Sequence, residues 1–135
     1  LLKNQVSFDS FLIPEQNLRV GDFRLLSTDF RAVLPIKTII RFIVSSADVI
    51  HAWAVPRLLI KLDAVPGRLN QLSSKILFPG VFYGQCSEIC GANHSFIPIS
   101  VEVVNLKTFI IWIKKLFNIE NTPNQPIHKV IFFKD

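Results

Sequence analysis

Short apolar segments separated by turn residues run through most of this chain. Residues 38–45 are rich in β-branched side chains, and later segments stop at Pro66-Gly67 and at Pro79-Gly80. Strands of this kind, about 8–12 residues apart with turn residues between them, are typical of β-sandwiches and β-barrels. The pattern therefore predicts an all-β fold. The remaining strand candidates are residues 49–55, 58–65, 75–78, 81–85 and 99–104.

Size and charge narrow the class of protein. A length of 135 residues fits one domain, and a hydrophobic fraction of 50% is enough to bury a core. The formal net charge is +5, yet the basic residues stand apart along the chain. A nucleic-acid-binding arm would often show a run of like charges, so we expect no nucleic-acid partner. Contact with lipid head groups or with an acidic partner is a simpler explanation of the positive charge.

The C-terminal part follows a different pattern. Residues 107–117 place apolar side chains near helical spacing, which predicts a short amphipathic helix. Residues 118–125 resemble a tail, and residues 127–133 would form a strand only against a partner strand. We therefore expect a domain over residues 1–117 and an extension over residues 118–135.

The chain holds no candidate membrane span and no recognisable leader. No segment reaches the roughly 18 apolar residues that a span needs. The sequence begins without Met and without a signal peptide. We therefore expect a processed product or a fragment, whose membrane anchoring, if any, comes from other sequence.

Two cysteines and a histidine lie close together, with Cys86, Cys90 and His94 at a spacing of four and four. Thiolate and imidazole are the ligands that copper and zinc prefer. Glycine and proline around these residues favour a loop, which can aim several side chains at one point. His51 lies in an apolar segment and is the best fourth ligand, because a buried histidine needs a partner. His128, in the tail, is the weaker candidate.

This spacing leaves three interpretations open. A pair of cysteines four residues apart can form a disulfide or remain as two buried thiols. Four cysteine and histidine ligands can also hold a structural zinc ion. The same ligands suit copper, and the spacing alone does not choose between the two metals.

The local sequence resembles a known family over most of the chain. Residues 84–96, Gly-Gln-Cys-Ser-Glu-Ile-Cys-Gly-Ala-Asn-His-Ser-Phe, closely resemble the dinuclear copper (CuA) loop of cytochrome c oxidase subunit II. The resemblance runs from about residue 8 to residue 112 and implies a cupredoxin-type Greek-key β-barrel, followed here by the short C-terminal helix and tail. The other similar motifs occupy residues 8–15, 21–26, 48–56 and 63–71.

The resemblance also implies a set of metal ligands. Cys86 and Cys90 match the two thiolates that bridge the copper ions in the family, and His51 and His94 match the terminal ligands, one for each copper. Glu88 matches the residue whose backbone carbonyl faces copper. Its side chain matches the family residue that reaches a magnesium ion at the border with subunit I.

Two departures from the family stand out. Ile97 occupies the position of a weak Met ligand, so we expect copper to bind with a shifted reduction potential. The sequence begins after the region in which the family carries its two N-terminal membrane helices, and the split expected here applies if the chain is complete. We therefore expect a split subunit II, with these helices on a separate N-terminal chain.

The resemblance implies an electron-transfer subunit of cytochrome c oxidase, a proton-translocating oxidoreductase of the respiratory chain. Its CuA centre would accept electrons from cytochrome c and pass them to haem a in subunit I, where oxygen is reduced to water. We expect other oxidase subunits as partners. The expected location is the mitochondrial inner membrane, with the domain facing the intermembrane space.

Two alternatives remain at this stage. One is a CuA-type domain of another reductase, and the other is a soluble copper carrier or assembly protein with the same ligands. Residues 63–71 favour the oxidase, because in that family this segment faces subunit I.

Overall fold

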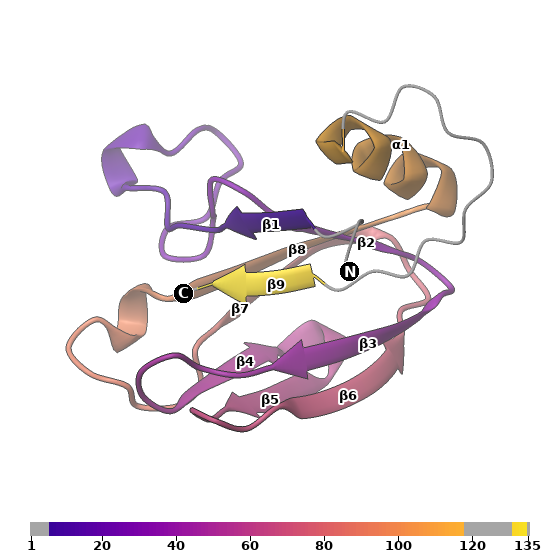
Figure 1. Cartoon of the computed structure of the whole chain (residues 1–135). Coiled ribbons are helices and arrows are strands. Elements are labelled where there is room, and N and C mark those ends of the chain that lie inside the picture. Colours follow the sequence, from indigo (N-terminus) through magenta and orange to yellow (C-terminus); the bar gives the residue numbers. More distant parts are fainter. Residues whose placement is uncertain (1–5, 118–130, 135) are drawn as a thin grey trace.

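Two layers of β-strands form the body of the domain (Figure 1). The computed structural model describes residues 6–117 and 131–134. One layer holds a three-stranded sheet, in which β8 (Pro98–Val104) lies between β2 (Ala32–Pro35) and β7 (Gly80–Gln85). β2 runs parallel to β8, and β7 runs antiparallel to it.

The other layer is built from two antiparallel pairs. β3 (Ile39–Val44) pairs with β6 (Asn70–Lys75), and β4 (His51–Val55) pairs with β5 (Ile60–Ala64). A two-stranded parallel ribbon of β1 (Val6–Asp9) and β9 (Ile131–Lys134) lies beside these layers. The 3-10 turns are η1 (Glu15–Asn17), η2 (Pro56–Leu58) and η3 (His94–Phe96). The predicted all-β architecture is confirmed.

β-Branched side chains fill the space between the layers. Val101 and Val103 of β8 and Val55 of β4 are almost fully buried. Burying one aliphatic side chain of this size stabilises the fold by roughly 1.5–3 kcal/mol. The rest of the buried cluster consists of Ala32, Leu34, Phe42, Ile60, Ile76 and Ile99.

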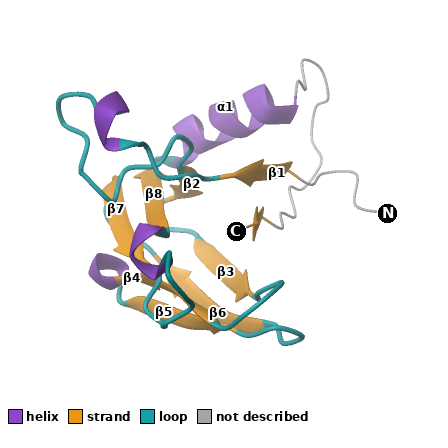
Figure 2. Ribbon diagram, turned by 90° about the vertical axis from the view of Figure 1, so that its left-hand side faces the viewer, coloured by secondary structure: helices purple, strands orange, loops and turns teal. Residues whose placement is uncertain are grey.

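The register of the strands gives the domain two ends. At the first end, which we call the site end, lie the pairs His51–Ala64, Val44–Asn70 and Gln85–Pro98. At the opposite end, which we call the far end, lie the pairs Val55–Ile60, Ile39–Lys75 and Gly80–Val103. Figure 2 looks toward the site end, and α1 (Leu106–Phe117) lies behind.

The expected helix is confirmed, and it begins one residue earlier than predicted. The Asn105 side chain caps it, because its Oδ1 accepts a hydrogen bond of 2.9 Å from the Thr108 backbone N–H. Ile113 is buried, and α1 lies against β2. Among the described residues, no helix has both the length and the apolar character needed to cross a bilayer.

Two strand predictions need correction. The strand expected over residues 75–78 instead covers Asn70–Lys75, which is mostly polar and exposed because its outer side faces solvent. β2 was not predicted, although all four of its residues are buried. Of the strand expected over residues 127–133, the structure shows Ile131–Lys134, and the rest lies outside the described residues.

A glycine lets the two layers approach closely beside the site end. A Cβ placed on Gly84 of β7 would overlap the carbonyl oxygen of Ala54 in β4 and lie 2.9 Å from its carbonyl carbon. Both neighbours are backbone atoms, so no side chain can move aside. Gly84 therefore sets the separation between β7, which leads to Cys86, and β4, which begins at His51.

We expect Gly84→Ala to destabilise the domain by about 2 kcal/mol or more, because the added methyl group forces β7 away from β4. Urea unfolding of the purified domain measures this loss. Gln85→Ala, at the next and exposed position of the same strand, is the matched control and should lose little stability. Equal stability of the Gly84 variant and the wild type would show that the strands are not in this close contact.

Candidate metal centre

The loop between β7 and β8 carries three of the predicted ligands. Its two ends are joined by a hydrogen bond of 3.1 Å from the Cys86 N–H to the Ile97 carbonyl. Gly91 has a φ of 133°, a conformation that favours glycine, and the His94 N–H donates to the Gly91 carbonyl over 3.2 Å. The loop therefore turns back on itself at Gly91 and returns His94 toward Cys90.

A second hydrogen bond attaches this loop to β4. The Ser87 N–H donates to the Ala52 carbonyl over 3.1 Å, which places Cys86 beside His51, the first residue of β4. Both side chains are well shielded, since the exposed fraction is 6% for Cys86 and 8% for His51. Backbone contacts thus bring together residues that are 35 positions apart.

The four predicted side-chain ligands follow one another in a bent series of contacts, which we call the row, because His51 also lies within 4.8 Å of Cys90. His51 Nδ1 is 3.9 Å from Cys86 Sγ, which is 3.8 Å from Cys90 Sγ, which in turn is 3.4 Å from His94 Nδ1. A disulfide would need sulfurs about 2.05 Å apart, so the two cysteines are not joined in this structure. His128, the weaker candidate, lies outside the described residues.

Glu88 contributes its backbone to the same cluster. The Glu88 carbonyl oxygen lies 3.3 Å from Cys86 Sγ. Glu88 as a whole is exposed to solvent. This placement is compatible with the two roles expected of Glu88, a carbonyl directed at the cluster and a carboxylate directed outward. Its role toward magnesium stays a prediction.

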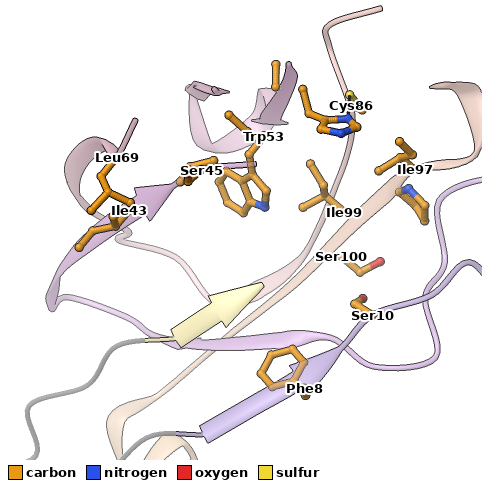
Figure 3. A pocket seen from close by; sticks show the side chains of 15 residues that line it. Phe8, Ser10, Ile43, Ser45, Trp53, Leu69, Cys86, Ile97, Ile99 and Ser100 are labelled. Atoms are coloured by element: carbon orange, nitrogen blue, oxygen red, sulfur yellow. Dashed lines mark hydrogen bonds between the residues drawn. The ribbon is translucent and has the colours of Figure 1, made fainter. Parts of the chain in front are cut away.

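A cavity of about 200 Å³ adjoins the cluster on its inner side (Figure 3). Cys86 and His51 form part of its wall, and Trp53, Ile97 and Ile99 form much of the rest. Ile97 thus lies where the sequence placed it, next to Cys86, but its side chain has no electron-pair donor. Most of this wall is apolar, although Ser10, Ser45 and Ser100 also line the cavity.

Asp48 orients His51. Its Oδ1 lies 2.9 Å from His51 Nε2, and the hydrogen bond with His51 is the main cause that lowers the pKa of Asp48 to about 2. An ionised carboxylate only accepts hydrogen bonds, so Nε2 carries the proton and Nδ1 presents its lone pair toward Cys86. The sequence prediction missed this role, although the spacing of three residues between Asp48 and His51 was visible.

The Cys86 thiol ionises more easily than an ordinary cysteine. Burial raises its pKa, but hydrogen-bonding interactions with the backbone of Ala52 and Glu88 and with the side chains of His51 and Cys90 outweigh this effect, and the pKa falls to about 7. The thiolate is the form that binds metals. The surroundings of Cys86 therefore favour the ligand form of its side chain.

The donor set fits soft metal ions. Metal–thiolate bonds are about 2.3 Å long, so one ion can touch both sulfurs at their separation of 3.8 Å. Ligand atoms of His51, Cys86 and Cys90 lie within 4.8 Å of one another, whereas His94 falls outside that group. Donors around a single tetrahedral ion lie roughly 3–4 Å apart. The row therefore suits two ions that share the thiolates better than one tetrahedral ion holding all four side chains.

The fold and the cluster together define a cupredoxin-like domain with a site of two thiolates and two imidazoles. Known proteins agree with this class. The model of the family "cytochrome c oxidase subunit II, periplasmic domain" matches residues 2–104, and the chain belongs to this family.

Named relatives extend the comparison. The chain is 54% identical over 115 residues to cytochrome c oxidase subunit 2 of Oenothera berteroana, covering 85% of this chain and 45% of the relative. It is 57% identical over 112 residues to the same subunit of Periplaneta americana, covering 83% of this chain and 49% of the relative. The chain thus spans about half the length of these curated relatives.

Solved structures support the fold directly. The periplasmic domain of subunit II of cytochrome oxidase from Bradyrhizobium japonicum superposes with a TM-score of 0.72 at 42% identity, covering 81% of this chain and 75% of that one. A mixed disulfide intermediate between a thioredoxin-like protein and subunit II of cytochrome c oxidase gives a TM-score of 0.66 at 41% identity, covering 81% and 73%. The cupredoxin-type fold predicted from the sequence is confirmed.

Asp48→Ala should weaken copper binding by about 10–100-fold, because the His51 ring loses the group that fixes its tautomer and orientation. Competition titration with a copper chelator measures the affinity. Asp63→Ala is the matched control, since Asp63 is an exposed acid of the same end, and its affinity should stay near the wild-type value. If both variants bound copper equally well, Asp48 would have no orienting role.

Proposed function

We propose that this chain is the electron-transfer domain of a cytochrome c oxidase. It would accept electrons from cytochrome c and pass them to haem a in subunit I, where oxygen is reduced. The observation that carries this proposal is the row of His51, Cys86, Cys90 and His94, with neighbouring ligand atoms 3.4–3.9 Å apart. One tetrahedral ion held by all four side chains fits this row less well, since the ligand atom of His94 lies outside the compact group that the other three form.

Each ligand has a distinct task in this proposal. Cys86 and Cys90 supply the shared thiolates, His51 and His94 bind at the two ends of the row, and the Glu88 carbonyl lies against Cys86. These residues would hold a dinuclear copper centre, which would supply one-electron chemistry shared between both ions with little rearrangement.

The protein frame limits rearrangement further. The exposed fractions of His51 and Cys86 are below one tenth, so few water molecules can reorient beside them. His51 is held by a strand and by Asp48, and the loop is held at both of its ends by backbone hydrogen bonds. A site that is held this way needs little reorganisation when its charge changes.

The surroundings of the site support a position inside an oxidase. We propose that the exposed Glu88 carboxylate reaches a magnesium ion shared with subunit I, and that residues 63–71 face that subunit. We further propose residues 1–117 as the copper domain and residues 118–135 as an extension. A mitochondrial intermembrane-space location and a separate chain with two membrane helices stay predictions.

A maturation step precedes copper binding in this proposal. One relative was solved as a mixed disulfide with a thioredoxin-like protein. In the present chain the sulfurs of Cys86 and Cys90 are 3.8 Å apart, close enough to join after a small rotation. We propose that, when an oxidant such as oxygen has joined the two sulfurs with loss of two electrons and two protons, a dithiol protein exchanges with the disulfide, releases Cys86 and Cys90 as thiols and takes up the disulfide itself.

Cys86→Ser tests the function directly. The variant loses one of the two shared thiolates, so the copper-loaded protein should lose its purple colour and its mixed-valence electron resonance signal. Visible absorption and electron paramagnetic resonance of the loaded protein measure both. Ser87→Ala, at the neighbouring exposed position, is the control and should keep them. A purple, mixed-valence Cys86 variant would refute the shared-thiolate site.

Ile97→Met tests the departure from the family. A thioether beside Cys86 adds a weak electron-pair donor, which stabilises the more positive oxidised state and should lower the reduction potential. Voltammetry of the loaded variant measures the shift, and the amount of bound copper should not change. Ile43→Met, on the part of the same cavity that lies away from Cys86 in Figure 3, is the control and should leave the potential nearly unchanged. A potential that is the same in the wild type and in Ile97→Met would show that position 97 does not face the metal.

A further inference from the structure

The far end of the domain differs sharply in charge from the site end. The segments that meet at the far end are residues 35–40, 55–61, 73–81 and 103–108, and they contain no Asp or Glu. Glu102, the strand partner of Val81, lies just beyond them, and its carboxylate is 3.7 Å from Arg31 Nη1. At the site end, Asp48, Asp63 and Glu88 are all exposed. The far end also holds five exposed cationic side chains: Lys37, Arg57, Lys61, Lys75 and Lys107.

Large apolar side chains are exposed among these cations. Phe78 is 74% exposed and Ile39 is 75% exposed, although core packing would bury such residues. Leu59 is 93% exposed at the tip of the β4–β5 hairpin. The others at this end are Leu77, Val81 and Leu106.

Backbone contacts show that the central part of this surface is continuous. Ile39 is the partner of Lys75 across the β3–β6 pair, and the Lys37 N–H donates to the Ile76 carbonyl over 2.7 Å. The Ile36 N–H donates to Val104, two residues before Leu106, over 2.9 Å. We call Ile39, Leu77, Phe78 and Leu106, together with Lys37, Lys75 and Lys107, the end patch. Its strand ends lie opposite η3 in Figure 1.

Two turns at this end each contain a residue in a backbone conformation that is unfavourable for its residue type. Lys37 has a φ of 56° and Leu59 a φ of 55°, in the left-handed region that L-residues other than Asn and Asp rarely occupy. Both side chains are exposed, so packing inside the chain does not explain them. Strained turns that project side chains into solvent are often found at binding surfaces.

The chemistry of the end patch selects its partner. Exposed apolar side chains that exclude water, ringed by charges of one sign, fit a surface with apolar anchors and the opposite charge. An anionic membrane surface would share that charge, but membrane-interface surfaces are enriched in Trp and Tyr. The far-end segments contain neither residue. We propose that the end patch binds an acidic, amphipathic segment of another protein.

Under this proposal, the excess positive charge of the chain lies at the far end and attracts the acidic partner. The net charge is +5, and the five far-end cations equal it in number. The patch lies at the end opposite the cluster of Cys86 and His51, so its partner and an electron donor at the site end can bind at the same time.

Photocrosslinking tests the proposal in the cells that make the chain. In one variant a photoreactive phenylalanine analogue replaces Phe78. In a second variant the analogue replaces Val20, which is fully exposed on the N-terminal loop. We expect position 78 to crosslink to one protein, with the crosslinked peptide rich in Asp and Glu, and position 20 to give no such product.

A charge-reversal variant provides the second test of the proposal. The double variant Lys37→Glu and Lys75→Glu should lower the crosslink yield at position 78 by about tenfold, because attractive contacts become repulsive. Lys114→Glu and Lys115→Glu on the distal part of α1 form the matched control and should leave the yield unchanged. Copper absorption should be normal in all these variants, which separates this result from the electron-transfer proposal.

The same experiment identifies the outcomes that would overturn the proposal. Crosslinks only to lipid, or stronger binding of the purified chain to phosphatidylcholine vesicles with cardiolipin than to those without, would assign the patch to a membrane. Crosslinks only to a second copy of the chain would make it a homodimer surface. A yield at position 78 no higher than at position 20 would mean that the patch has no partner.

Discussion

Two backbone hydrogen bonds determine where the metal ligands can lie. The bond from Cys86 to Ile97 closes the base of the β7–β8 loop, and the bond from Ser87 to Ala52 fastens that loop to β4. Because backbone groups make both contacts, the position of the loop does not depend on a particular side chain. The close approach of Gly84 to Ala54 lets β7 lie near enough to β4 for the second bond to form. Without these contacts, His51 would not meet Cys86, and the cluster would hold too few donors for two ions.

The domain separates its chemistry between two ends. The site end holds the soft ligands and the exposed acids Asp48 and Glu88, whereas the far end presents cations and apolar side chains. The β-layers between them have a tightly packed core around Val55, Val101 and Val103. A rigid core of this kind keeps the two ends at a fixed separation. In the two proposals, one end would receive electrons while the other stays attached to a partner.

The fold class and the closeness of Cys86, Cys90 and His94 could be predicted because their signals are local, whereas the assignment of these residues and His51 as copper ligands came from the family resemblance and stays a prediction. The β-branched run in β3 and the spacing of Cys86, Cys90 and His94 can be read directly from the sequence. β6 was displaced in the prediction, because its polar residues are exposed and lack the alternation that marks a half-buried strand. The interaction of Asp48 with His51 was missed, because spacing cannot reveal how a side chain turns. The end patch was not visible either, since it joins residues from three segments that only the fold brings together.

Copper K-edge X-ray absorption of the loaded chain can show whether the cluster holds two copper ions that share the thiolates, because it counts the atoms around each metal ion. If the row of ligands holds two ions, the spectrum should show copper–copper scattering and two sulfur neighbours for each copper, with two copper ions bound per chain. A single metal ion per chain, or copper ions without a shared pair of sulfur neighbours, would contradict the dinuclear site and the electron-transfer role that depends on it.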